Sequence, residues 1–220
     1  MIKDLILSID FFSKLNNREL ELLESISSLK RYPKNSILHY ETESSISLEF
    51  LISGHIKIYK MDKFDNEIFL YYIYQGGLIS EVSSLQADTI NCFSNSEFTQ
   101  DSQILSVDFN QFKKLFLNKN ILTIDFIDKL VQKNHQLQCV VNRELVFDAT
   151  AKVAYMLAND LKIFNNLKRQ EVSFMLHIQP ETLSRVLKRL KRDKIINAEQ
   201  GSIVILDEEK LTTIFTGIGL

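Results

Sequence analysis

The hydrophobic pattern of this chain changes its period twice, and this constrains the fold more than any other feature. Residues 1–30 repeat leucine and isoleucine at helical spacing among charged residues. Between residues 37 and 107, short runs of β-branched and aromatic residues alternate with turn signals such as Ser53-Gly54. From Asn110 onward the period is helical again. The predicted strands are 37–40, 48–52, 55–59, 68–74 and 104–107.

Short strands separated by turn signals are typical of antiparallel sandwiches and jelly rolls. The pattern therefore predicts an α+β protein with three parts. Residues 1–118 are expected to form a jelly-roll β domain, residues 119–146 a long helix, and residues 147–220 a smaller C-terminal domain. A chain of 220 residues is long enough for two small domains.

The predicted long helix carries a heptad-like seam. Ile127, Leu130, Asn134, Leu137 and Val141 follow one another at alternating spacings of three and four. In a parallel two-stranded coiled coil, one buried asparagine fixes register and partner number, so we expect a homodimer through this helix. A helix packed on its own domain is the alternative. Because the seam is short, other parts of the chain must also contribute to the dimer.

Charge is distributed unevenly along the chain. Residues 162–194 contain nine basic and three acidic residues, a net charge of +6, whereas the whole chain carries −2 and the remainder therefore −8. A basic segment in an otherwise acidic chain favours contact with a polyanion. A basic face that only meets water is the alternative.

The basic segment has the pattern of a helix-turn-helix. Residues 169–176 form a predicted short helix and residues 177–179 a tight connection. Pro180 is predicted to begin a second helix that ends near Arg192. Proline suits the first turn of a helix, because the N–H that it lacks would have no acceptor within the helix at that position. A helix capped by Asp148 precedes this motif, and a hairpin resembling the wing of a winged helix follows it. The hairpin strands and turn are 195–198, 202–205 and Gln200-Gly201.

The second helix of this motif is predicted to present two different faces. Arginine can bind guanine O6 and N7 together, glutamate accepts from cytosine N4, and serine bonds to bases or phosphate. A glutamate on a surface for a polyanion opposes nonspecific attraction, which suits a specificity element. The face predicted to be buried has Leu183, Val186, Leu187 and Leu190. The predicted base contacts are Glu181, Ser184 and Arg185, with phosphate contacts at Lys188 and Arg189.

These residues carry a family resemblance. Arg-Gln-Glu-Val at 169–172 and Pro-Glu-Thr-Leu-Ser-Arg-Val-Leu at 180–187 resemble the DNA-binding signature of the CRP/FNR family of bacterial transcription regulators. Residues 51–59 resemble that family's sensor β-roll, and residues 76–81 resemble the turn after it. The resemblance covers essentially the whole chain and is weakest between residues 86 and 103.

The resemblance implies a homodimeric regulator with a cyclic-nucleotide-binding-like β-roll sensor, a dimerisation helix and a winged helix-turn-helix. Such a protein binds double-stranded DNA at a palindromic promoter site and contacts RNA polymerase. The pattern Glu181-x-x-Ser184-Arg185 resembles the FNR branch, whose half-site resembles TTGAT. His177 stands where a glycine is common in the turn. The analogy adds phosphate contacts at Gln170 and Thr182, and Arg169 is a further predicted phosphate contact.

The effector of the β-roll stays unassigned. Residues 80–85 keep the glutamate and leucine of the family's cyclic-nucleotide cassette, but no arginine occurs between Arg31 and Arg143. Without a guanidinium the cyclic phosphate loses its bidentate contact, so the sequence disfavours a cyclic nucleotide. The first cysteine is Cys92, which disfavours an N-terminal iron–sulfur cluster. A small organic effector, a redox signal and the absence of any ligand remain open alternatives. Haem also remains open, although each candidate ligand is expected to be an ordinary histidine. These candidates are His39, His55, His135 and His177.

Two other functions compete with this interpretation. A cupin-like metalloenzyme is the first, but no His-x-His pair occurs in the strands, so we expect neither a metal site nor catalytic residues. A non-DNA interaction protein with a basic docking segment is the second.

Cys92 and Cys139 are isolated and expected to be structural thiols. No apolar run approaches the roughly 18 residues that span a bilayer, so we expect a cytoplasmic protein without a membrane partner.

Overall fold

The computed structural model describes residues 2–199 and 202–216 of the chain. Contacts within the chain divide it into two compact units, residues 1–136 and residues 137–220. We call these the N-terminal unit and the C-terminal unit. Among the described residues, no helix combines the length and apolar character needed to cross a membrane.

The N-terminal unit begins with short helices, α1 (Ile2–Leu7), η1 (Asp10–Phe12) and α2 (Asn17–Ser25). Asn16 caps α2 by accepting from the Glu19 N–H, and the Glu19 carboxylate accepts from the Asn16 N–H in return. The prediction of helix to residue 30 is wrong, because a strand begins at Ser27. Pairing of that strand with residues 102–107 satisfies its backbone groups and overrides the local helical spacing.

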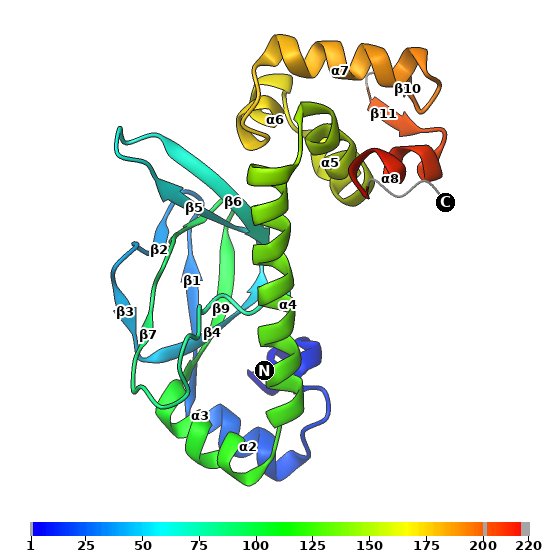
Figure 1. Ribbon diagram of the computed structural model, residues 1–220. Coiled ribbons are helices and arrows are strands. Elements are labelled where there is room, and N and C mark those ends of the chain that lie inside the picture. The colour runs from blue at the N-terminus through cyan, green and yellow to red at the C-terminus, as the bar shows by residue number, and fades with distance from the viewer. Residues whose placement is uncertain (1, 200–201, 217–220) are drawn as a thin grey trace. The chain divides into compact units, whose positions relative to one another are not determined.

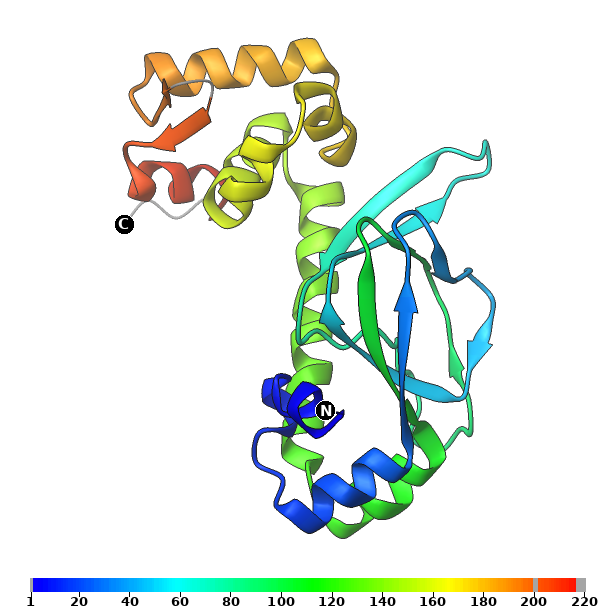
Figure 2. The same cartoon turned by 180° about the vertical axis from the view of Figure 1, so that it is seen from behind.

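Antiparallel strands fold into the predicted β-roll (Figures 1 and 2). One sheet has the order β1-β9-β4, a second β2-β8-β5-β6, and a short third sheet pairs β3 with β7. The sequence missed β1, β3, β7 and β8, which are short or rich in polar residues. The strands are β1 (Ser27–Tyr32), β2 (Ile37–His39), β3 (Ser44–Ser45), β4 (Ser47–Ser53), β5 (Ile56–Met61), β6 (Glu67–Ile73), β7 (Ile90–Asn91), β8 (Asn95–Phe98) and β9 (Ser102–Asp108).

Aromatic rings join the β-roll to the helices of the N-terminal unit. Phe11 stacks on Phe50 of β4 with ring centroids 5.1 Å apart, and it also contacts Phe12, Phe112 and Phe126. All five rings are buried, and each fully buried phenylalanine contributes about 2 to 3 kcal/mol from the removal of apolar surface from water. This packing anchors the start of α4 (Thr123–Val141), which follows α3 (Phe109–Leu115) and η2 (Leu117–Lys119).

The C-terminal unit confirms the predicted helix-turn-helix and hairpin. A π-helical segment, Asn142–Val146, leads to α5 (Ala149–Asn166), and Asp148 caps α5 by accepting from the N–H groups of Thr150 and Ala151. The predicted hairpin turn at Gln200-Gly201 lies outside the described residues. The remaining elements are α6 (Arg169–Met175), α7 (Pro180–Arg192), β10 (Ile196–Glu199), β11 (Ser202–Ile205) and α8 (Glu208–Thr216).

Candidate nucleic-acid interface

Helix α7 is strongly amphipathic. Leu183, Val186 and Leu190 are buried within the C-terminal unit, and Leu187 is half-buried. Pro180 occupies the first turn, as predicted. Burial of this aliphatic face fixes which side of α7 remains in solvent.

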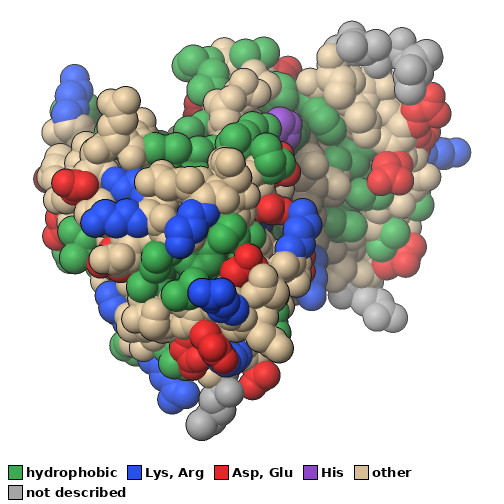
Figure 3. Space-filling model, turned by 90° about the horizontal axis from the view of Figure 1, so that it is seen from below, with side chains coloured by type: hydrophobic (Ala, Val, Ile, Leu, Met, Phe, Trp, Pro, Cys, Tyr) green, Lys and Arg blue, Asp and Glu red, His purple; other side chains and the backbone are tan. Residues whose placement is uncertain are grey.

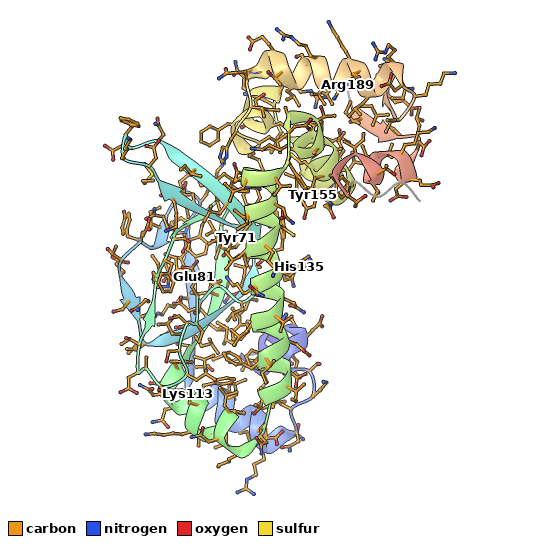
Figure 4. All side chains as sticks on the ribbon, viewed as in Figure 1. Tyr71, Glu81, Lys113, His135, Tyr155 and Arg189 are labelled. Atoms are coloured by element: carbon orange, nitrogen blue, oxygen red, sulfur yellow. The ribbon has the colours of Figure 1, made fainter. Side chains whose placement is uncertain are left out.

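The exposed face of α7 brings the predicted base-contacting residues together. Glu181, Ser184 and Arg185 are all exposed, and Lys188 continues the same face one turn later. Figure 4 shows a row of side chains that project from α7 on the side away from α5. Side chains of this kind on one helical face can meet the edges of consecutive bases in a major groove.

The predicted phosphate contacts differ in their surroundings. Gln170 is exposed in the first turn of α6, and Thr182 is half-buried on α7. The guanidinium of Arg169 stacks 4.8 Å from the centre of the Phe164 ring, and burial lowers its pKa. Arg189 donates to the Thr150 hydroxyl of α5. Arg169 and Arg189 are thus partly engaged within their own unit, whereas Lys188 points into solvent.

The turn between α6 and α7 is closed by the backbone. The N–H of His177 donates to the Phe174 carbonyl, and the N–H of Ile178 donates to the Ser173 carbonyl, each at 3.1 Å. His177 has a positive φ of 51°, a conformation in which glycine avoids a steric penalty that other residues carry. The turn therefore has helix-turn-helix geometry although histidine replaces glycine.

Sequence reasoning missed Glu144, which lies in the π-helical segment. Its carboxylate accepts from Arg143 Nε at 2.7 Å and Lys152 Nζ at 3.3 Å, and lies 2.8 Å from His177 Nδ1. Partial burial opposes ionisation, but the hydrogen bonds from His177 and Arg143 outweigh it and lower the pKa of Glu144 to about 2. No local signal pointed to this cluster, because Glu144 and His177 are 33 residues apart.

The outer face of α4 carries an apolar stripe. Ile127, Leu137 and Val141 of the predicted seam are exposed, and so is Asn134. Leu130 packs instead against the core of the N-terminal unit. The neighbouring Ile124 and Val131 are 69% and 60% exposed, so the stripe passes through Val131 rather than Leu130. We call Ile124, Ile127, Val131, Asn134, Leu137 and Val141 the α4 stripe.

The opposite side of α4 is attached to the β-roll through Lys133. Its ammonium donates to the Ile79 carbonyl at 3.1 Å and lies 5.5 Å from the centre of the Tyr71 ring. Burial lowers the pKa of Lys133 to about 8, and the nearby Glu81 offsets this only in part. Figure 4 shows Tyr71 on the side of the β-roll next to α4. The Glu81 carboxylate accepts from the Phe93 N–H and the Ser94 hydroxyl.

A small cavity lies inside the β-roll, where both isoleucine and polar side chains line it. It has a volume of about 10 Å³, close to the space of one water molecule. Glu49 is 2% exposed, and its carboxylate lies 2.5 Å from His39 Nε2. Burial raises the pKa of the Cys92 thiol to about 11, and Glu81 adds to this shift, so the thiol is protonated at neutral pH. In this conformation the cavity has no room for a nucleotide.

The described residues contain no cluster of three or more His, Cys, Asp or Glu side chains that could hold a metal ion. His39 is paired with Glu49 and His177 with Glu144, while the His55 ring packs edge-on against Tyr74. His135 lines a groove beside α4. In the part of the chain that the structure describes, these side chains therefore do not meet at one centre.

Comparison with known proteins agrees with this geometry. A family model described as a Crp-like helix-turn-helix domain matches residues 151–214. The cAMP-activated global transcriptional regulator CRP of Pasteurella multocida is 24% identical over 197 residues, which cover 84% of this chain and 93% of the relative. The helix-turn-helix thus matches a Crp-like domain, and the chain resembles a CRP transcription regulator over most of its length.

Solved structures share the fold of this chain over most of its length. FixK2 from Bradyrhizobium japonicum has a TM-score of 0.66 at 14% identity and covers 86% of this chain and 97% of its own. A putative CRP/FNR-family transcriptional regulator from Eubacterium rectale has a TM-score of 0.61 at 15% identity, with 95% and 99% coverage. The family consists of transcription regulators rather than enzymes, and the helix-turn-helix is its DNA-binding domain.

Proposed function

We propose that this chain is a regulator of the CRP/FNR type, a cytoplasmic, non-enzymatic homodimer that binds a palindromic promoter site with TTGAT-like half-sites. The observation that carries the proposal is the joint exposure of Glu181, Ser184 and Arg185 on one face of α7. The three side chains suit direct readout of base edges. Lys188 and Gln170 supply phosphate contacts at either end of the motif.

The α4 stripe supports the homodimer. Apolar side chains at heptad-like spacing, interrupted by one asparagine, suit self-pairing of two α4 helices. A groove of about 940 Å³ runs beside the stripe between α4 and the end of β6, and Tyr74, Val131 and Gln136 line it. This groove adds apolar surface that the partner's helix can cover. Two α7 helices in one dimer would then meet two half-sites, which is how a helix-turn-helix protein reads a palindrome.

The mixed surface of the N-terminal unit argues against a second polyanion site there. On the face formed by α2 and α3, basic and acidic side chains lie among hydrophobic ones (Figure 3). The net charge of +6 is instead concentrated in residues 162–194, which contain α6 and α7. We infer that DNA meets the C-terminal unit, and that the β-roll receives the signal. Contact with RNA polymerase follows only from the family resemblance.

The test is selection of bound sites from a library of random duplexes with the full-length protein. We expect an inverted repeat with TTGAT-like arms. Recovery of unrelated sequences at equal frequency would contradict sequence-specific binding and favour the interaction-protein alternative. Repeating the selection with Glu181→Gln separates direct readout from general attraction, because this change should alter preference at one position of each arm.

A further inference from the structure

The carboxylate of Glu144 connects three elements of the C-terminal unit. Arg143 of the same π-helical segment donates to Oε1, Lys152 of α5 donates to Oε2, and His177 of the helix-turn-helix turn contacts Oε2. The side chains of Glu144 and His177 are each 24% exposed, and that of Lys152 is 10% exposed. Charge-assisted hydrogen bonds in such partly desolvated surroundings are stronger than surface ion pairs.

Glu144 and His177 lie at positions from which their contact can affect DNA binding as well as stability. Glu144 follows α4 by three residues, and α4 carries the stripe through which we propose that two copies pair. His177 precedes Pro180, the first residue of α7, by three residues. One carboxylate therefore joins the segment that leaves the dimer helix to the turn that orients the recognition helix.

The backbone of His177 shows why the turn needs such support. Its φ of 51° lies in the left-handed region, which carries a penalty of about 1 kcal/mol for a residue with a Cβ. A glycine would relieve that strain, but it would also remove the imidazole that contacts Glu144. The contact with Glu144 offsets the strain and restricts the turn to one conformation.

We propose that Glu144 is a positioning residue for DNA binding, which holds the turn before α7 through its contact with His177. The proposal rests on the proposed function. The charged groups at this carboxylate are Arg143 from its own segment and Lys152 from α5. The carboxylate itself stays ionised, since the pKa of Glu144 is about 2.

The experiment measures the affinity of the full-length protein for the selected duplex by fluorescence anisotropy. Glu144→Gln and His177→Asn should each lower this affinity by about 5-fold. Asparagine is chosen because it tolerates a left-handed φ. The double variant should lose no more than either single variant, because both changes remove one contact.

Two controls separate the positioning role from general effects. Glu208→Gln removes the same charge from an exposed position on α8 and should leave the affinity unchanged. A duplex with one half-site should show a smaller loss than the palindrome, because the contact matters most when two recognition helices must match one spacing. Circular dichroism establishes that each variant is folded.

The outcomes are distinguishable. If Glu144→Gln retains the wild-type affinity, or if the effects of the two single variants add, the positioning role is wrong. If the wild-type protein binds no duplex specifically, the proposed function fails, and the same cycle is then measured by thermal unfolding. Additive changes in the free energy of unfolding would then overturn the contact itself.

Discussion

Helices α4 and α7 each have a buried face and an exposed face, but the exposed faces have opposite chemistry. Along the α4 stripe the exposed side chains are Ile, Val and Leu, with Asn134 among them. On α7 they are Glu, Ser, Arg and Lys. Apolar surface of this extent on a helix calls for a protein partner, whereas a row of hydrogen-bonding groups on a basic helix suits a polyanion. This difference supports our proposal that α4 recognises a second copy of the chain and that α7 recognises DNA.

The largest expected effect comes from reversing the chemistry of the α4 stripe. Val131→Glu would bury an unpaired carboxylate in the paired helices, which costs on the order of 3 to 5 kcal/mol. We expect the protein to become monomeric at micromolar concentration in sedimentation velocity and to lose most of its affinity for a palindrome.

The control for this change introduces the same charge beside the stripe. Gln132 is exposed on the adjacent side of α4, and Gln132→Glu should leave the dimer intact. If both variants dissociate equally, net charge rather than the stripe controls assembly. A wild-type monomer would show that the exposed face of α4 has a different partner.

The next effect tests whether the exposed face of α7 reads bases. Arg185→Ala should cost about 1 to 3 kcal/mol of binding free energy on the selected site and relax the preference at one base pair in each arm. A competition assay with single-base variants of the site measures both quantities. An equal loss on random DNA would show that Arg185 contributes only charge.

A third prediction concerns the buried faces, which also differ. The buried face of α7 is aliphatic, whereas α4 buries the ammonium of Lys133 against the β-roll. Because the pKa of Lys133 is about 8 in the folded protein against 10.5 for a free side chain, the unfolded chain binds more protons between these values. Stability should therefore rise as the pH increases from about 8 to 10.5, on the order of 2 kcal/mol.

Urea unfolding at a series of pH values measures this dependence. Lys133→Met should remove the rise, since methionine fills similar space without a charge. Lys129→Met, one turn earlier on α4, is the matched control and should retain it. A rise of the same size in both variants would assign the alkaline dependence to other groups.

These examples show which features the sequence could predict. The helix-turn-helix was accessible because its signals are local: a period of 3.6, a first-turn proline at Pro180 and a cluster of basic residues. The β-roll was recognised from its apolar strands. Strand β8, Asn95–Phe98, was missed because two of its buried residues are polar and become buried only through pairing with β2 and β5.

The sites that depend on tertiary packing were not accessible. Leu130 and Val131 are adjacent and equally apolar, and only the packing of α4 on its own core decides which one is exposed. The Glu144–His177 contact joins residues 33 positions apart, and Glu144 lies outside the helix-turn-helix motif that contains His177. The lysine that attaches α4 to Ile79 appears in the sequence as an ordinary helical surface residue. Sequence periodicity predicts where the helices lie, but three-dimensional packing decides which face of each helix is buried.

The smallest effect separates two kinds of contact on the same face of α7. Lys188 is exposed one turn beyond Ser184, where we expect it to contact phosphate. Lys188→Ala should weaken binding to all duplexes by about 1 kcal/mol or less and reduce the slope of log affinity against log salt concentration by about one unit per half-site, because one fewer counterion is released.

Lys210→Ala removes the same charge from α8 and should leave this slope unchanged, since Lys210 is paired with Asp207. If the two variants flatten the slope equally, DNA responds to the net charge of the unit. If Lys188→Ala alone flattens it while Arg185→Ala alone changes base preference, the exposed face of α7 is divided into a base-reading part and a phosphate-binding part.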